Sequence, residues 1–164
     1  DNIFMIWEDR KFCDIGNTNR LQLENMLKYR FDFISINPSG GYKSIEPFFD
    51  RIGIFVLAEM SCEGHFLNKE YTNNCLQLVN KYNTKISGII NQTIDRVDIH
   101  KNILSITPGV HLGDLGKNKK NNDNLGQNYR SINNLPHNPD IIVVGRAIYN
   151  NEDPCYVIDC LLKR

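Results

Sequence analysis

An α/β fold built on a parallel sheet is the architecture that this sequence of 164 residues predicts. Short apolar runs rich in Ile, Val and Phe alternate along the chain with longer and more polar stretches. The runs are bounded by Gly, Pro, Asn or Asp, and short continuous runs of this kind are typical of strands buried on both faces of a parallel sheet. The predicted strands span residues 3–7, 31–36, 52–58, 86–90, 103–106 and 141–144.

Helices are predicted after these strands, over residues 18–30, 44–51, 70–82, 93–99, 130–135 and 153–163. The first and the third show the clearest pattern, because apolar side chains recur along one side of each. These side chains are Leu21, Leu23, Met26 and Leu27 in the first helix, and Cys75, Leu76, Leu78 and Val79 in the third. A strand followed by a helix, repeated with short links, predicts parallel strands in one sheet.

Composition narrows the class of protein. The 19 basic and 19 acidic residues balance, which argues against a general affinity for nucleic acid. No apolar run approaches the ~20 residues that span a bilayer, and no secretory signal is visible.

The cysteines and histidines do not show the spacing of a disulfide framework or a metal site. The five cysteines form no CxxC pair, so we expect reduced thiols in the cytoplasm. No two of the four histidines have helical i, i+4 spacing, so we expect no metal site. Because the first residue is Asp1 and not Met, we expect a piece of a longer chain.

A compact group of charges follows the first apolar run. Asp9 and Lys11 are two residues apart, and in a strand such residues project to the same face. Asp14 lies beyond the predicted strand end. Charges placed directly after a buried strand are costly unless they pair or take part in chemistry. A solvated charge run is the alternative for an isolated D-x-K-x-x-D pattern, because short motifs are weak on their own.

The longer string E-D-R-K-F-C-D-I-G-N-T at residues 8–18 resembles orotidine 5′-phosphate decarboxylases. Three later segments support the resemblance in order: L-A-E-M-S at 57–61, T-P-G-V at 107–110, and L-G-Q-N-Y-R at 125–130 with D-I-I-V-V-G-R at 140–146. The resemblance implies a (β/α)8 TIM barrel, whose active site lies at the carboxyl ends of the strands. The six units seen here match the third to the eighth, so the first two are missing from this single barrel domain, residues 1–164.

The resemblance also implies an activity, the decarboxylation of orotidine 5′-phosphate to UMP in pyrimidine biosynthesis without a metal or an organic cofactor. Lys11 is then the proton donor to C6 of the pyrimidine, and Asp9 holds its ammonium group charged and oriented. Asp14 and Thr18 match residues that reach the active site of the other subunit. The family resemblance therefore implies a homodimer with shared active sites.

Further positions match substrate-binding residues of the family. Ser61 corresponds to a serine that contacts the pyrimidine, and Pro108 follows another strand end. Residues 110–128 are a long link with three Gly and several Lys and Asn, which is typical of a functional lid or an insert. We expect this stretch to be a phosphate-gripping loop with a solvated insert at 117–124. The residues expected to hold the phosphate are Gln127, Tyr129, Gly145 and Arg146.

Two other functions stay open. A related phosphosugar enzyme of the wider superfamily keeps the D-x-K-x-x-D pattern but typically needs Mg²⁺. A non-catalytic nucleotide-binding or dimerising remnant would keep Asp9, Asp14, Gln127 and Arg146 after losing the first two units. Metal-independent turnover distinguishes the first alternative, and UMP binding without turnover identifies the second.

Overall fold

The computed structural model describes residues 4–113, 126–135 and 138–163, and its centre is a parallel sheet of six strands. The strands are β1 (Trp7–Phe12), β2 (Phe33–Ile36), β3 (Gly53–Leu57), β4 (Gly88–Ile90), β5 (Leu104–Pro108) and β8 (Ile141–Val143). They lie side by side in the order β1-β2-β3-β4-β5-β8, with β1 and β8 at the edges. This order brings the carboxyl ends of all six strands to one rim of the sheet, as the alternating pattern predicts.

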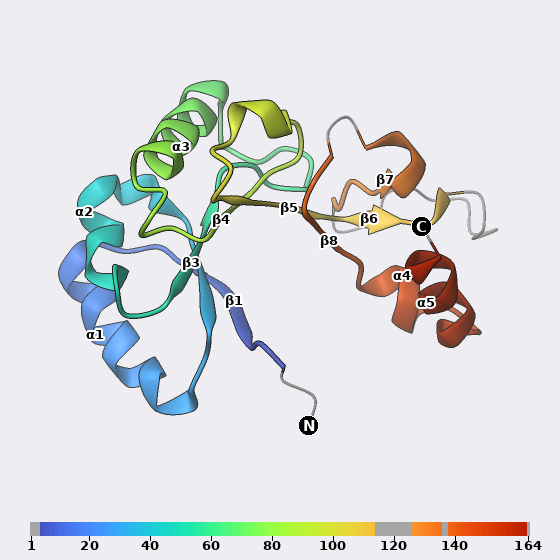
Figure 1. The fold of residues 1–164 in the computed structure, drawn as a ribbon, viewed down its shortest axis with the longest axis horizontal. Helices are drawn as coiled ribbons and strands as arrows, with labels where there is room; N and C mark the ends of the chain where they lie inside the picture. The colour runs from blue at the N-terminus through green and yellow to red at the C-terminus, as the bar shows by residue number, and fades with distance from the viewer. Residues whose placement is uncertain (1–3, 114–125, 136–137, 164) are drawn as a thin grey trace.

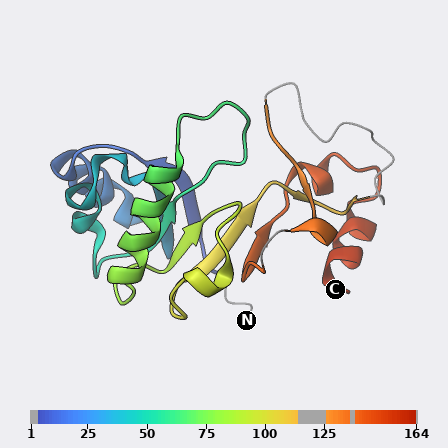
Figure 2. The same ribbon diagram turned by 90° about the horizontal axis from the view of Figure 1, so that it is seen from above.

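The helices fall into two groups (Figure 1). On one side of the sheet lie α1 (Gly16–Met26), α2 (Tyr42–Ile45) and α3 (Lys69–Lys81). The elements β6 (Val110–His111), β7 (Arg130–Ser131), α4 (Arg146–Tyr149) and α5 (Pro154–Leu162) gather at the opposite end of the molecule in both views (Figure 2). Short 3-10 turns at Leu27–Tyr29, Pro38–Gly40, Glu46–Phe48, Arg96–Asp98 and Ile132–Asn134 complete the elements.

Apolar side chains cover both faces of the sheet. The larger cluster joins the sheet to α1, α2 and α3 and includes Leu23, Ile34, Val56 and Val79, all fully buried. A smaller cluster lies on the other face, where Phe55, Leu57, Ile90 and Ile106 are buried and Trp7 and Phe33 pack against them. Because side chains alternate along a strand, burial on both faces explains why the strands read as continuous apolar runs.

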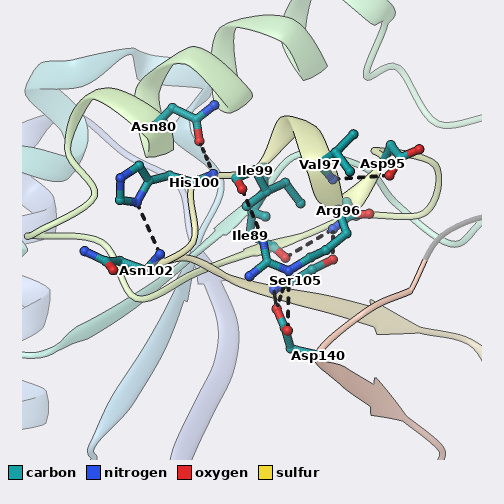
Figure 3. Close-up of polar contacts among 11 residues, drawn as sticks. Asn80, Ile89, Asp95, Arg96, Val97, Ile99, His100, Asn102, Ser105 and Asp140 are labelled. Atoms are coloured by element: carbon teal, nitrogen blue, oxygen red, sulfur yellow. Dashed lines mark hydrogen bonds and ion pairs between the residues drawn. The ribbon is translucent and has the colours of Figure 1, made fainter.

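A polar cluster fastens the last strand to the sheet at its amino-terminal end (Figure 3). The backbone N–H of Ser105 donates to Oδ2 of Asp140 at 2.8 Å, and the N–H of Asp140 donates back to the carbonyl of Ser105 at 2.9 Å. The guanidinium of Arg96 lies 3.1 Å from the same carboxylate. These contacts fix where β8 begins, so Gly145 and Arg146 follow at the opposite, carboxyl end.

Three predicted elements are wrong. The first strand covers Trp7–Phe12 and not 3–7, because its partner β2 begins only at Phe33; Phe4 before it is 79 % exposed. The stretch 93–99 holds only the 3-10 turn Arg96–Asp98, and 130–135 forms β7 and another 3-10 turn. The predicted loop 110–128 begins with β6, which pairs with β7 in parallel. Its predicted insert at 117–124 lies outside the described residues.

Among the residues that the structure describes, none of the helices has the length and apolar character that crossing a bilayer requires.

Candidate active site

The Asp9–Lys11 pair forms at the carboxyl end of β1. Nζ of Lys11 lies 2.9 Å from Oδ1 of Asp9 and donates to the backbone carbonyl of the same residue at 3.2 Å. Both side chains stay partly open to solvent, 33 % for Lys11 and 50 % for Asp9. The two residues therefore form an ion pair at the rim of the sheet, where a ligand can reach the ammonium group.

A bulge in β1 sets the geometry of this pair. The strands β1 and β2 are in register at Glu8 with Ile34 and again at Phe12 with Ile36. Three residues of β1 between these points consequently face a single residue of β2, Ser35. Lys11 within the bulge has a backbone φ of 58°, a left-handed conformation that costs a non-glycine residue about 1 kcal/mol or more and persists only where its surroundings impose it.

Asp14 and Thr18 lie at the start of α1. Oδ1 of Asp14 accepts a hydrogen bond from the N–H of Ile15 at 2.7 Å, and Thr18 is half-buried in the first turns of the helix. Among the described residues, no hydrogen bond or ion pair joins Asp14 to the Asp9–Lys11 pair. Within one chain, the structure thus brings two of the three predicted catalytic residues together.

Ser61 and Gln127 meet across the rim although they are far apart in the sequence. The segments 61–63 and 126–128 run antiparallel: Asn128 N–H donates to the Ser61 carbonyl at 2.8 Å, and Glu63 N–H donates to the Gly126 carbonyl at 2.8 Å. The side-chain amide of Gln127 also donates to the Ser61 carbonyl, at 3.0 Å. The predicted pyrimidine-binding segment 61–63 and the predicted phosphate-binding segment 126–128 therefore pair with each other, and together they form one wall of the candidate site.

Gly109 makes the close approach of this wall possible. Its φ is +76°, and a Cβ built on it would lie 2.6 Å from Nε2 of Gln127 and 3.2 Å from Cβ of Ser61. Any other residue would combine a strained backbone with a clash against the Gln127 amide and tight contacts with Ser61 and with the Asn128 carbonyl at 3.1 Å. Gly109, directly after β5, thus leaves the space that the side chains of Ser61 and Gln127 occupy.

A chain of hydrogen bonds ties the rim together from β3 to β7. The carboxylate of Glu59 accepts from the N–H groups of Gln92 and Thr93 at 2.5 and 2.7 Å. The amide of Gln92 donates to the carbonyl of Pro108 at 3.0 Å, and Arg130 donates to the carbonyl of Gln92 at 3.0 Å. Pro108 therefore takes part in the rim through its backbone.

Tyr129 and Arg146 lie together beyond the end of β8. The Arg146 guanidinium carbon is 5.4 Å from the centroid of the Tyr129 ring. Burial raises the pKa of the Tyr129 phenol, and nearby Tyr149 raises it further, so the phenol stays protonated as a hydrogen-bond donor. Gly145 has a φ of −116°, and a Cβ there would meet only the Tyr149 ring at 3.7 Å. The Arg146 cation thus lies over the ring of Tyr129, whose hydroxyl keeps its proton.

Residues 1–159 match the family described as "Orotidine 5'-phosphate decarboxylase / HUMPS family". The chain belongs to this family.

Relatives and solved structures agree with the match. The chain is 33% identical over 168 residues to a uridine 5'-monophosphate synthase of Caenorhabditis elegans, covering 94% of this chain and 32% of the relative. It is 32% identical over 166 residues to an orotidine 5'-phosphate decarboxylase of Candida tropicalis, covering 92% of this chain and 59% of the relative. A crystal structure of orotidine 5'-phosphate decarboxylase from Pyrococcus horikoshii OT3 matches with a TM-score of 0.70 and 25% identity, covering 96% of this chain and 72% of that chain.

The chain therefore spans less than two thirds of the length of these two curated relatives. The described residues form a curled parallel sheet of six strands that is similar to a solved structure of the family. This confirms the predicted (β/α)8 architecture for the part of the barrel that this chain contains. Among the described residues, no group of three or more His, Cys, Asp and Glu side chains is placed to hold a metal ion.

Sequence reasoning missed three residues that shape the decarboxylase-like site: Ser35, Glu59 and Arg130. Ser35 looks unremarkable inside an apolar strand, because the bulge that it faces belongs to another strand. Glu59 lies inside the motif L-A-E-M-S and Arg130 inside L-G-Q-N-Y-R. Their places in these motifs are the sequence signal that could have identified them as site residues. Their role is visible only in the folded chain, where Glu59 after β3 and Arg130 in β7 both contact the segment that follows β4.

Proposed function

We propose that this protein decarboxylates orotidine 5′-phosphate to UMP. The observation that carries the proposal is the Lys11 ammonium, held 2.9 Å from Asp9 on a bulge at the carboxyl end of β1. The names of the relatives favour this reaction over that of a phosphosugar enzyme, because the chain is about a third identical to proteins named as orotidine 5'-phosphate decarboxylases and uridine 5'-monophosphate synthases.

The chemistry follows from the charge of Lys11. When the bond between C6 and the carboxyl carbon breaks, the electron pair stays on C6 and CO2 leaves. No neighbouring carbonyl delocalises that charge, so a fixed cation beside C6 stabilises it with little reorganisation. Lys11 then transfers a proton to C6, which yields UMP, and regains a proton from water. Asp9 favours the charged form of Lys11 and holds it in place. The step needs neither a metal nor an organic cofactor.

The substrate is proposed to lie along the rim from Lys11 to Arg146. Ser61 contacts the pyrimidine, and Pro108 lines the site next to it. Arg146, Tyr129, Gln127 and the backbone at Gly145 hold the phosphate. Contacts to a remote phosphate stabilise the closed site, so they raise the rate at a distant carbon. In this proposal, 110–128 is the loop that closes on the phosphate.

We also propose a cytoplasmic homodimer with shared active sites. Asp14 lies just before α1 and Thr18 in its first turns, and among the described residues neither forms a hydrogen bond or ion pair with the Asp9–Lys11 pair, so a contribution to catalysis fits an active site of a second subunit.

A decarboxylation assay on the full-length natural protein tests the function. We expect loss of orotidine 5′-phosphate and formation of UMP at the same rate with and without EDTA. Turnover of a phosphosugar that stops with EDTA would establish the metal-dependent alternative. Binding of UMP without any turnover would establish the non-catalytic one. Either result would contradict the proposed function.

A further inference from the structure

We propose that Ser35 is a positioning residue that directs the Lys11 ammonium; this inference rests on the proposed function. Ser35 lies in the middle of β2 and is fully buried. Its hydroxyl donates to Oδ1 of Asp9 at 2.8 Å and accepts from the backbone N–H of Lys11 at 3.1 Å. One side chain therefore contacts both members of the pair.

The bulge explains why a side chain takes this role. In a regular parallel ladder, the N–H of Lys11 would donate to a backbone carbonyl of β2. Because three residues of β1 face Ser35 alone, the regular ladder is interrupted at this point. The Ser35 hydroxyl takes the place of the backbone partner and so stabilises the left-handed conformation of Lys11. A buried N–H left without any partner would be costly.

The hydroxyl also fixes the carboxylate. A hydroxyl has one proton, and here that proton points to Oδ1 of Asp9 while the oxygen accepts from Lys11. The same Oδ1 is the atom that lies 2.9 Å from Nζ of Lys11. Ser35 thus orients the acceptor that in turn holds the ammonium, and it also fixes the backbone from which the lysine side chain starts.

A residue with this position affects the chemical step more than substrate binding. Ser35 lies behind the ion pair in the sheet, whereas the predicted phosphate contacts lie on Gln127, Tyr129 and Arg146. Without the hydroxyl, the Asp9 carboxylate can rotate and Lys11 can leave the bulge conformation. A misplacement of about 1 Å at a catalytic group can lower the rate on the order of 10²-fold.

The test compares three variants of the full-length natural protein. Ser35→Ala removes the hydroxyl, and Ser35→Thr keeps it. Ser105→Ala is the matched control, because Ser105 is also a fully buried strand serine. Its hydroxyl accepts a hydrogen bond from the side-chain amide of Asn91 at 2.9 Å, in a different part of the sheet. The readouts are kcat, KM, the Kd for UMP and the thermal midpoint, together with a crystal structure of Ser35→Ala.

We expect Ser35→Ala to lower kcat on the order of 10²-fold while the Kd for UMP changes less than about threefold. Ser35→Thr should recover most of the lost kcat, and Ser105→Ala should lower the thermal midpoint with kcat near that of the wild type. In the crystal, Nζ of Lys11 should move away from Oδ1 of Asp9 in Ser35→Ala.

Three results would overturn the inference: a wild-type kcat in Ser35→Ala, an equal loss of kcat in folded Ser35→Thr, or an unmoved Lys11 in the crystal. A wild-type protein without turnover would instead refute the proposed function. The crystal structure then still decides whether Ser35 positions Lys11.

Discussion

At the scale of single residues, the site depends on side chains that share their contacts. Lys11 has a strained backbone and an ion pair with Asp9, and Ser35 contacts both residues. Arg146 and Tyr129 form a second pair, a cation over an aromatic ring at 5.4 Å. The first pair faces the chemistry and the second faces the phosphate in the proposed function, so substitutions in the two pairs should have different kinetic effects.

Replacing Arg146 should weaken phosphate binding selectively. In Arg146→Ala we expect the Kd for UMP to rise roughly 10- to 100-fold, because charge-assisted hydrogen bonds to phosphate are lost. The Kd for uridine, which has no phosphate, should hardly change. Isothermal titration with both ligands measures the difference, and Arg51→Ala, at an exposed arginine, is the control. Equal loss of affinity for UMP and uridine would refute the phosphate role.

At the scale of elements, the sequence pattern predicts most strands because their burial is local and continuous. The runs at 31–36, 52–58, 86–90 and 141–144 each contain the observed strand. The strand predicted at 3–7 is wrong, because apolar residues form a strand only where a neighbouring strand can pair with them. The observed β1 pairs with β2 over Trp7–Phe12. The stretches 93–99 and 130–135 are predicted helical, but the first forms only a 3-10 turn. The second begins with β7, whose pairing with β6 is a long-range contact.

In the site, too, local contacts are predictable from the sequence and long-range contacts are not. The Asp9–Lys11 contact is predictable because opposite charges two residues apart attract, but the bulge, and not regular strand alternation, sets its geometry. The meeting of Ser61 with Gln127, and the role of Ser35, depend on neighbours far apart in the chain. No local pattern encodes such neighbours, so only the folded chain places them.

Gly109 tests whether the wall of Ser61 and Gln127 needs this close approach. Gly109→Ala should displace Gln127 and raise KM for orotidine 5′-phosphate by about tenfold, because its Cβ would lie 2.6 Å from Nε2 of Gln127. Gly41→Ala is the matched control: its φ is +74°, but a Cβ there has no atom within 4 Å. Both variants carry backbone strain and only one carries the clash. A KM that rises equally in both would contradict this account.

The packing of α3 on β3 can be tested through Cys75. Burial raises the pKa of the Cys75 thiol to about 12, so its reactive thiolate is roughly 10⁻⁴ of the thiol at pH 8. Iodoacetamide at pH 8 should modify the exposed Cys13 and Cys155 at least about 100-fold faster than Cys75. Peptide mass spectrometry over time measures the rates, and denaturant should abolish the difference. Fast labelling of Cys75 in the native protein would show that α3 does not pack as described.

At the scale of the whole molecule, the rim joins segments from the entire chain. The edge strands β1 and β8 contribute the Asp9–Lys11 pair at one end and the Gly145–Arg146 turn at the other. Among the described residues, Asp14 and Thr18 form no hydrogen bond or ion pair with the Asp9–Lys11 pair. The proposed homodimer accounts for this, because each site would take Lys11 from one subunit and Asp14 from the other.

Subunit mixing tests the shared site. We expect Lys11→Ala and Asp14→Ala to be nearly inactive alone. After the two variants are unfolded and refolded together, mixed dimers should contain one wild-type site each, which restores about a quarter of the wild-type activity by random assortment. Mixing two batches of Lys11→Ala is the control. No recovery in an equimolar mixture that is dimeric by sedimentation would contradict the shared arrangement.

The turnover number of Lys11→Ala in the full-length natural protein tests whether Lys11 is the catalytic cation and proton donor. We expect kcat to fall on the order of 10³-fold or more, because the variant loses both the cation and the proton donor, while the Kd for UMP changes little. Lys85→Ala, which removes an exposed ion pair with Asp50 at 2.6 Å, should keep wild-type activity. A kcat for Lys11→Ala within a few-fold of the wild type would contradict the account.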